Sequence, residues 1–401
     1  PEIEYVVNAC DAGREGELIF KHVYDLSGSK KPVKRLWISS LEDSAILDGM
    51  QHLRSAEEYR HLAEAAVCRS QADWLVGMNA TRAYTTKYFK KLTVGRVQTP
   101  TLAMLVERAG QISNFQKEKY FNVELDCDGI PAVKPKIFDP DEAEQLRSRC
   151  QGSEAIVTAV KETEKKVKAP KLYDLTTLQR EANRIYGMTA KQTLDTAQSL
   201  YEKKLITYPR TDSQYLTEDM EQTARNVVRQ IYEKYQLTGP FDQPEQPDVK
   251  KVMNNSKVTD HHAIIPTMEL ASCHLDELKS WEEKILFLIA VHTVMAMSKD
   301  HIYQETEIEV ECQGEIFKAK GKTVLQDGWK LFENCFKNKD RMAIVDPDQE
   351  MKERMPKVTQ GQTFYAVAAE KTEHFTSPPK PYSEDTLLAA METAGNKEFD
   401  E

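Results

Sequence analysis

The chain has 401 residues, of which 40% are apolar and 29% are charged. This length exceeds what one hydrophobic core usually serves, so the sequence predicts about two to four domains. No apolar run approaches the length of a membrane span, and the first residues do not resemble a signal peptide, so a membrane-spanning protein is not indicated. The seven cysteines include no CxxC spacing, and reduced thiols in a cytosolic protein are the simplest interpretation.

The formal net charge of -10 argues against a nucleic-acid partner at first sight, but the charge is unevenly distributed. Residues 60–100 carry seven Lys or Arg side chains against two acids, and residues 161–210 carry eleven against six. A basic interior enclosed by an acidic exterior suits a protein that surrounds DNA. Random clustering of charge on solvated faces explains the same distribution equally well.

The predicted elements begin by alternating between strand and helix. A strand at residues 4–9, a helix at 16–26 and a strand at 33–38 form a βαβ pattern, which predicts a parallel sheet. Helical periodicity then covers residues 56–82 and 100–109.

Strand-like patterns follow in the next part of the chain. We expect strands at residues 120–126 and 155–161, with the polar, proline-bearing stretch 131–141 as a loop between them. The polar residues 236–258 are expected to form a mobile loop. A buried helix is expected at 284–297, after which strands return.

Two helices joined by a tight glycine turn are predicted before the second polar stretch. The first covers residues 175–185 and ends at Gly187, and Thr189 with Gln192 forms a capping box for the second. A strand at 205–208 follows. Together these elements resemble a winged helix-turn-helix.

Both ends of the chain are abrupt. Pro1 leads directly into an apolar strand pattern, and Glu401 follows shortly after a helix-like stretch at 384–394, which three prolines in 375–381 precede. Neither end is typical of a natural terminus, so we expect the chain to be a fragment of a longer protein.

The segment CDAGREGE lies between the first predicted strand and helix, where α/β sheets present polar groups. Asp11, Glu15 and Glu17 place three carboxylates within seven residues, and such oxygen ligands suit Mg²⁺, which takes one or two carboxylates and keeps several waters. Acids at a helix start also complement the helix dipole, so both interpretations stay open. Arg14 is placed to meet a phosphate.

The segment LITYPRTDS ends the strand predicted at 205–208. Pro209 fixes the chain so that Arg210 falls on the same side as Tyr208. A tyrosine hydroxyl has a pKa of about 10, so it attacks a phosphodiester well only beside positive charge, and Arg210 offers a planar fork of donors for the phosphate. Taken alone, a strand tyrosine that merely packs its ring is the commoner case.

Two further motifs carry candidate residues. In DHHAIIPT, consecutive histidines point in different directions and no third ligand motif is nearby, so His261 is better suited to a phosphate or a proton than to zinc. A structural loop histidine is an equal alternative. In VGRVQTP, Arg96 and Gln98 reach one side and, with Arg69 and Asp73, predict either a phosphate-backbone groove or a tight turn with a salt bridge.

Taken together, these segments resemble the type IA DNA topoisomerase family, most closely its topoisomerase III branch. The match runs in family order through DAGREGELIF, ADWLVGMNATRA, VGRVQTPTL, LQREAN, LITYPRTDS, DHHAIIPT and SEDTLLAAME. Ordered matches of this number are far more specific than any one of them.

The resemblance implies a multidomain mixed α and β fold, the type IA topoisomerase toroid. Its domains would be a partial Toprim α/β domain at 1–48, a helical single-strand DNA-binding domain at 49–115 continued by 371–401, a β-rich arch or gate domain at 116–168 continued by 268–370, and a winged-helix-like domain with the catalytic tyrosine at 169–267.

The resemblance also assigns roles to individual residues. Tyr208, Arg210 and His261 match catalytic positions. The other matching residues line the single-strand groove (Arg69, Asp73, Arg96 and Gln98) or belong to the acidic metal triplet (Asp11 and Glu15).

The chain departs from the family pattern in two ways. Gly13 stands where the middle acid of the triplet usually sits, and Glu17 is a possible substitute. The first Toprim strand, with its glutamate and lysine, is absent, as is a long C-terminal region. We therefore expect this fragment itself to be inactive in DNA relaxation.

The implied activity is an ATP-independent DNA topoisomerase that relaxes negative supercoils and decatenates DNA through a transient 5′-phosphotyrosine, with Mg²⁺ as cofactor. Its partners would be single-stranded DNA, negatively supercoiled duplex DNA and a RecQ-type helicase, and we expect a monomer in the cytoplasm, associated with the nucleoid. The alternatives are a Toprim metal-dependent nuclease or primase, which needs no tyrosine, and a non-catalytic DNA-binding clamp, which forms no covalent adduct.

Overall fold

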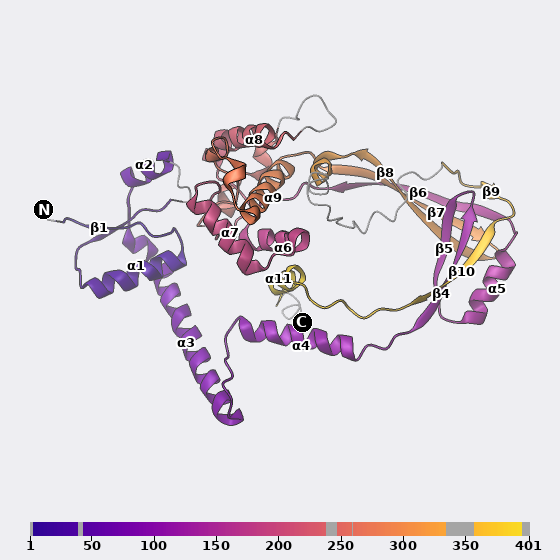
Figure 1. Ribbon diagram of the computed structural model, residues 1–401, viewed down its shortest axis with the longest axis horizontal. Coiled ribbons are helices and arrows are strands. Elements are labelled where there is room, and N and C mark those ends of the chain that lie inside the picture. The colour runs from indigo at the N-terminus through magenta and orange to yellow at the C-terminus, as the bar shows by residue number, and fades with distance from the viewer. Residues whose placement is uncertain (1–2, 39–42, 238–246, 259, 334–356, 395–401) are drawn as a thin grey trace. The chain divides into compact units, whose positions relative to one another are not determined.

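The computed structural model of the protein describes residues 3–38, 43–237, 247–258, 260–333 and 357–394 (Figure 1). The chain divides into two compact units. The first unit comprises residues 1–107, 170–297 and 382–401, and the second comprises residues 108–169 and 298–381.

The first unit contains a small sheet near the start of the chain. Its strands, in the order β1-β2-β3, are β1 (Val6–Asn8), β2 (Val33–Arg35) and β3 (Arg54–Ser55). Strand β1 lies parallel to β2, with helix α1 (Arg14–Ser27) as the connection between them, and β3 is antiparallel to β2. The predicted βαβ unit with a parallel pair of strands is therefore confirmed.

Three helices follow in the sequence, namely α2 (Asp43–Gln51), α3 (Arg60–Tyr88) and α4 (Gln98–Ser113). The predicted helices at 56–82 and 100–109 correspond to α3 and α4. Helix α1 packs against α3. Ala66 is nevertheless the only α3 residue that is buried, and large side chains such as Trp74 and Tyr88 are exposed.

The rest of the first unit is mainly helical and contains its core. The helices are α6 (Leu175–Tyr186), α7 (Ala190–Glu202), α8 (Glu221–Tyr235), α9 (Ser280–Ala296) and α11 (Glu384–Glu392). Every residue of α9 from Ile285 onward is buried, which is typical of a helix that is apolar on all sides. The buried helix predicted at 284–297 and the final helix predicted at 384–394 are confirmed.

The turn between α6 and α7 forms as predicted. Gly187 has a φ of 67°, in the left-handed region that a glycine adopts without a Cβ clash, and it ends α6. Thr189 then accepts a hydrogen bond from the Gln192 backbone N–H, and the Gln192 side chain accepts one from the Thr189 N–H. This capping box fixes the start of α7, the helix that leads to Tyr208.

The prediction of a strand at residues 205–208 is wrong. Ile206 forms only an isolated bridge with Pro266. The Ile265 N–H donates to the hydroxyl of Thr207 instead of a backbone carbonyl, and Pro209 has no N–H to continue a ladder. The Thr207 N–H donates to the Ile265 carbonyl and the Thr267 N–H donates to the Leu205 carbonyl, so the pairing consists of this one bridge and does not extend into a strand.

The polar stretch predicted as a mobile loop at 236–258 is only partly described. Residues 238–246 and 259 lie outside the described residues. Where it is described, the stretch is structured, because it forms the 3-10 helices η3 (Val249–Val252) and η4 (Asn255–Lys257). Buried Val249 and Val252 anchor the first of these to the core.

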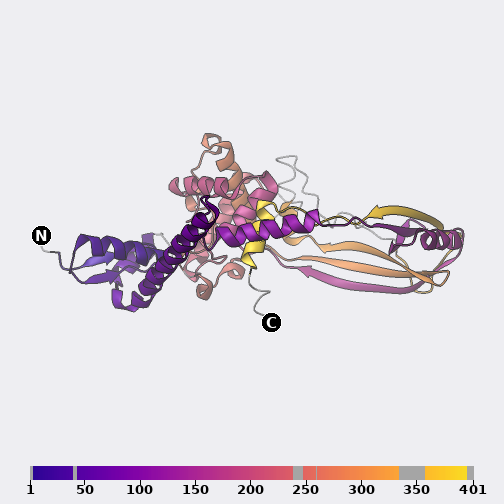
Figure 2. The ribbon, with the colours of Figure 1, turned by 90° about the horizontal axis from the view of Figure 1, so that it is seen from below.

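The second unit is built on an antiparallel seven-stranded sheet, in which β6, β7 and β8 run side by side as long strands (Figure 2). The strands are β4 (Lys119–Cys127), β5 (Ile130–Ile137), β6 (Ala155–Val167), β7 (His301–Cys312), β8 (Glu315–Gln326), β9 (Thr363–Phe364) and β10 (Ala368–Phe375). Their order is β10-β4-β5-β8-β7-β6-β9. The predicted strands at 120–126 and 155–161, and the strands expected after α9, are confirmed.

The loop predicted at 131–141 is also wrong. It contains most of β5, and helix α5 (Pro140–Cys150) starts at its end. Ile130, Ala132 and Ile137 are buried, so apolar contacts hold the segment in the sheet despite its prolines. Asp139 caps α5, and Pro140 occupies the first helical position, where no backbone N–H is needed.

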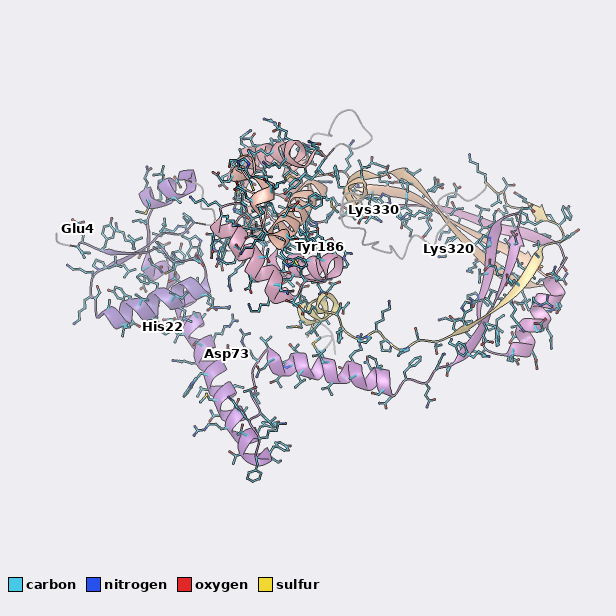
Figure 3. The ribbon with its side chains drawn as sticks, in the orientation of Figure 1. Glu4, His22, Asp73, Tyr186, Lys320 and Lys330 are labelled. Atoms are coloured by element: carbon cyan, nitrogen blue, oxygen red, sulfur yellow. The ribbon has the colours of Figure 1, made fainter. Side chains whose placement is uncertain are left out.

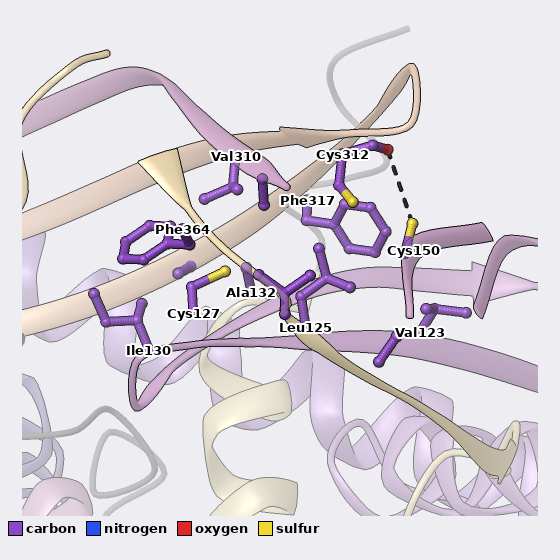
Figure 4. Close-up of a cluster of buried hydrophobic side chains, with 14 of the residues drawn as sticks. Val123, Leu125, Cys127, Ile130, Ala132, Cys150, Val310, Cys312, Phe317 and Phe364 are labelled. Atoms are coloured by element: carbon purple, nitrogen blue, oxygen red, sulfur yellow. Dashed lines mark hydrogen bonds between the residues drawn. The ribbon is translucent and has the colours of Figure 1, made fainter. Parts of the chain in front are cut away.

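The core of the second unit is formed by side chains of the sheet and of α5, which packs on β4 and β10. Figure 4 shows part of this cluster, including Leu125, Phe317 and Cys150. Three of its residues are buried cysteines, Cys127, Cys150 and Cys312. Burial raises the pKa of the Cys127 and Cys312 thiols to about 12, so both stay protonated at neutral pH. All six described cysteines are free, in agreement with reduced thiols, and Cys335 lies outside the described residues.

Candidate active site

Tyr208 follows α7 in the chain and lies half-buried between two aromatic side chains. Its ring centroid is 4.3 Å from that of His261 and 5.3 Å from that of Tyr201, which meets it edge-on. Burial raises the pKa of the Tyr208 hydroxyl, the Asp11 charge and a hydrogen bond to Asp11 raise it further, and Arg210 lowers it. The hydroxyl is therefore protonated at neutral pH and lies beside a carboxylate and a guanidinium.

His261 is the second member of this cluster. Its side chain is 11% exposed, and its Nε2 lies 4.0 Å from Oδ1 of Asp11. Burial lowers the pKa of the ring more than Asp11 raises it, which favours the neutral imidazole at pH 7. The hydroxyl of Thr211 donates to the His261 carbonyl at 2.8 Å, which ties the two motifs together.

The turn that carries Asp11 is held by a buried guanidinium. Arg35, 1% exposed, donates from Nη2 to the Asp11 carbonyl at 2.6 Å and from Nη1 to the Cys10 carbonyl at 2.6 Å. It also donates from Nη1 to the carbonyls of Asn8 and Leu36. One side chain of β2 thereby fixes the path of the backbone into α1.

The partner of Arg35 is Glu17, whose Oε1 lies 2.6 Å from the Arg35 Nε. Glu17 is 7% exposed and also accepts a hydrogen bond from the Asn8 amide. Its carboxylate is thus directed into the interior. The suggestion that Glu17 takes the place of a missing metal ligand is wrong, because Arg35 and Asn8 occupy it.

Two glycines allow the close approaches in this turn. A Cβ on Gly16 would lie 2.0 Å from the Asp11 carbonyl oxygen, so only glycine fits there without moving the turn. A Cβ on Gly13 would lie 2.1 Å from Oδ2 of Asp260. Burial raises the pKa of Asp260, as do the charges of Asp212 and Asp11, while Arg14 and Arg35 lower it.

Glu15 lies on the other side of this turn, next to arginines. Its Oε1 is 3.6 Å from Nε of Arg14 and 3.9 Å from Nη1 of Arg69 on α3. The Arg14 Nε is buried and has no hydrogen-bond partner among the described residues. Guanidinium groups at this position suit an incoming phosphate.

The remaining groove candidates form a separate pair. The Arg96 Nε donates to Oδ2 of Asp73 at 2.8 Å, and both side chains are about half exposed. Asp73 lies on α3 (Figure 3). Arg69 precedes it by one helical turn, and Gln98 is exposed at the start of α4. The structure thus brings Tyr208, His261 and Asp11 together. Arg96 is linked to this cluster indirectly, because its partner Asp73 lies on α3 one turn from Arg69, which is near Glu15.

The donor set around Asp11 fits a weakly held magnesium ion. The described residues contain no group of three or more His, Cys, Asp or Glu side chains arranged to enclose a metal. Mg²⁺ needs only one or two carboxylates, because it keeps waters and binds substrate phosphates. Asp11 and Glu15 have exposed carboxylates, and the Asp260 carboxylate fills the space above Gly13.

The chain is similar in sequence to known proteins. The sequence profile of the DNA topoisomerase family matches residues 57–395. This chain belongs to that family. It is 40% identical over 403 residues to DNA topoisomerase 3 of Bacillus subtilis strain 168, covering 98% of this chain and 54% of that protein. It is 38% identical over 400 residues to DNA topoisomerase 3 of Staphylococcus epidermidis, with the same shares covered.

A solved structure shows the same fold. Full-length topoisomerase I from Thermotoga maritima superimposes with a TM-score of 0.72 at 25% identity, over 96% of this chain and 62% of that one. The resemblance to type IA topoisomerases and their mixed α and β multidomain fold is therefore confirmed. The chain spans about half the length of the curated relatives it matches. Among the described residues, no helix is long and apolar enough to cross a membrane.

Sequence reasoning missed three residues of this site. Arg35 had only a weak signal, a charged residue within an apolar strand pattern. Asp260 directly precedes the histidine pair and was not assigned a role. The contact of Tyr201 with Tyr208 cannot be predicted without knowing how the chain turns after α7.

Proposed function

We propose that this chain carries the strand-cleaving centre of an ATP-independent type IA DNA topoisomerase, with Tyr208 as the nucleophile. The observation that carries the proposal is the cluster of Tyr208, His261 and Asp11, which three sequence-remote segments bring together. A tyrosine hydroxyl, a neutral imidazole, a carboxylate and a nearby arginine are the groups that a transesterification at phosphorus requires.

In the proposed reaction, the Tyr208 oxygen attacks the phosphorus of a DNA backbone phosphodiester. A bond from that oxygen to phosphorus forms, the bond from phosphorus to the 3′ oxygen breaks, and the 3′ oxygen takes a proton. The products are a 5′-phosphotyrosine and a free 3′-hydroxyl. One phosphodiester replaces another, so the step is close to reversible and needs no ATP.

The neighbouring groups have distinct roles in this step. Tyr208 loses its proton as it attacks. The nearby Asp11 carboxylate and the neutral His261 ring are placed to accept this proton or to pass one to the 3′ oxygen. Arg210 is exposed and close enough to lower the pKa of Tyr208. We propose that it binds the scissile phosphate and stabilises its developing charge.

Mg²⁺ would be held by Asp11 and Glu15. When bound, such an ion positions phosphate and hydroxyl oxygens and balances their charge. The protein itself orients Asp11 through Arg35 and keeps Glu15 next to Arg14 and Arg69. We propose that this arrangement serves mainly the rejoining step, in which the 3′-hydroxyl has to be held near the phosphotyrosine.

The single-strand groove would run from Arg69 past Asp73 to Arg96 and Gln98. Two of these residues lie one turn apart on α3, and the Arg96–Asp73 pair is exposed. We also propose a division into four domains, two of them discontinuous, with boundaries after residues 48, 115, 168, 267 and 370. We further propose a monomeric protein in the cytoplasm. Its strand passage would relax negatively supercoiled DNA and decatenate DNA. A RecQ-type helicase is the proposed protein partner.

The proposal is tested by trapping the covalent intermediate. Single-stranded DNA labelled at its 3′ end is incubated with the full-length protein and then denatured, because a 5′-phosphotyrosine retains the 3′ part of the strand. Labelled protein, with the nucleotide mapped to the peptide containing Tyr208, is the expected result. Nicking without labelled protein would support a metal-dependent nuclease, and binding without either product would support a clamp.

A further inference from the structure

A carboxylate from a distant part of the chain covers Gly13. A Cβ added to Gly13 would lie 2.1 Å from Oδ2, 2.5 Å from Cγ and 2.9 Å from Oδ1 of Asp260. Real Cβ atoms essentially never approach other atoms closer than 3.0 Å. The Asp260 carboxylate therefore fills the volume that a side chain at position 13 would enter.

The backbone does not explain why residue 13 is glycine. Gly13 has φ of -172° and ψ of 176°, an extended conformation that any residue adopts. Gly28, at the other end of the same helix, differs in this respect, since its φ of 65° lies in the left-handed region. A side chain at position 13 would therefore have to displace the Asp260 carboxylate, and backbone strain would not oppose it.

Asp260 belongs to the site of Asp11 and Tyr208. It directly precedes His261, whose Nε2 is 4.0 Å from Asp11. The charged groups that act on its carboxylate are those that surround the α1 turn, namely Asp212, Arg14, Asp11 and Arg35. Two carboxylates about 250 positions apart in sequence thereby share one electrostatic environment.

We propose that Asp260 supplies the carboxylate that position 13 lacks and binds the divalent cation together with Asp11. This inference rests on the proposed Mg²⁺ site. Oxygen ligands from two segments suit an ion that takes one or two carboxylates and completes its shell with water and phosphate. Because Asp260 and His261 are consecutive, binding of the ion and placement of His261 next to Tyr208 become coupled.

A purely structural role for Asp260 makes a different prediction. Gly13 is the N-cap of α1, and it has no side chain to cap the helix. In a purely structural role, the Asp260 carboxylate would stabilise α1 by its charge near the positive end of the helix dipole and by accepting hydrogen bonds from the first N–H groups of the helix. In that case, loss of the carboxylate would lower thermal stability and leave cation affinity unchanged.

The test measures Mn²⁺ binding to the full 401-residue chain by electron paramagnetic resonance, with Mg²⁺ as competitor. Asp260→Asn should weaken binding at least about tenfold, the scale of a damaged metal site. Asp212→Asn is the matched control, because Asp212 also acts on the charge of Asp260, whereas the three atoms nearest to a Cβ on Gly13 all belong to Asp260; it should change affinity less than about threefold. The double variant Gly13→Asp, Asp260→Gly returns a carboxylate to position 13 and should recover affinity to within about threefold of the parent.

Asp11→Asn separates this inference from the proposal on which it rests. If Asp11→Asn weakens Mn²⁺ binding and Asp260→Asn does not, the inference about Asp260 is overturned and the Mg²⁺ site stands. If the parent chain does not bind Mn²⁺, both fail. Adduct formation by Tyr208 is measured independently, so neither outcome bears on the nucleophile.

Discussion

Replacing Arg35 by lysine should loosen the turn that carries Asp11 while keeping the positive charge. The guanidinium uses four N–H groups to reach five acceptors, the Glu17 carboxylate and the carbonyls of Asn8, Cys10, Asp11 and Leu36, because the two hydrogens of Nη1 serve three carbonyls. An ammonium group lacks the planar fork of donors, and the Asn8 and Asp11 carbonyls also accept the N–H groups of Leu36 and Gly13. The two acceptors that lose their donor are therefore the carbonyls of Cys10 and Leu36. At about 1–3 kcal/mol for each unsatisfied group, and with partial rehydration, the local cost is about 2–4 kcal/mol.

Hydrogen exchange of the β1–α1 segment is the appropriate assay, because a chain with two compact units need not unfold in one step. The expected cost corresponds to exchange about 30- to 900-fold faster at these amides in Arg35→Lys. Arg54→Lys is the matched control, since Arg54 is an exposed arginine on β3 of the same sheet. Equal protection in both variants would refute the role given to the Arg35 network.

Three further outcomes follow from the structure. Arg96→Ala should weaken oligonucleotide binding and reduce its salt dependence by about one phosphate contact, whereas Asp73→Asn, which removes the ion-pair partner of Arg96, should not weaken binding. If Arg96→Ala binds with the parent's affinity and the parent's salt dependence, the motif is a structural turn. Burial works to raise the pKa of Glu282, but hydrogen bonds from Lys203, Ser199 and the Lys279 N–H outweigh it and lower the pKa to about 2. About 3 kcal/mol of stability is therefore present above pH 5 and is lost as the pH falls toward 2. Glu282→Gln should abolish this pH dependence in acid unfolding, and an equal loss of stability in both proteins would contradict the assignment. The 401-residue chain, which spans about half the length of its relatives, should not relax supercoiled plasmid at any Mg²⁺ concentration, and efficient relaxation relative to the full-length protein would disprove this.

Local patterns predicted the elements that local interactions determine. The helix pair around Gly187 was predictable because its signals, a left-handed glycine and a capping box, lie within six residues of one another. The βαβ unit was predictable for a similar reason. Strand β5 was not, because its prolines have the appearance of a loop, and only its neighbours in the sheet show that Ile130 and Ala132 belong to a core.

The site was predictable as a set of residue types and not as an arrangement. The motifs identified Tyr208, His261 and Asp11 separately, and their contacts depend on long-range folding that periodicity does not describe. The same limitation explains Glu17, which the sequence offered as a substitute for the acid missing at position 13. Its buried partner, Arg35, is eighteen positions away, and such a pairing has no local signature.

The most direct test of the account is the covalent adduct formed by the Tyr208→Phe variant of the full-length protein. The change removes only the hydroxyl, so oligonucleotide binding should stay close to that of the parent. Tyr201→Phe, the same change in the ring that packs edge-on against Tyr208, is the control and should retain the adduct. The account predicts no labelled protein from Tyr208→Phe with 3′-labelled DNA, and an adduct at the parent's yield would assign the nucleophile to another residue.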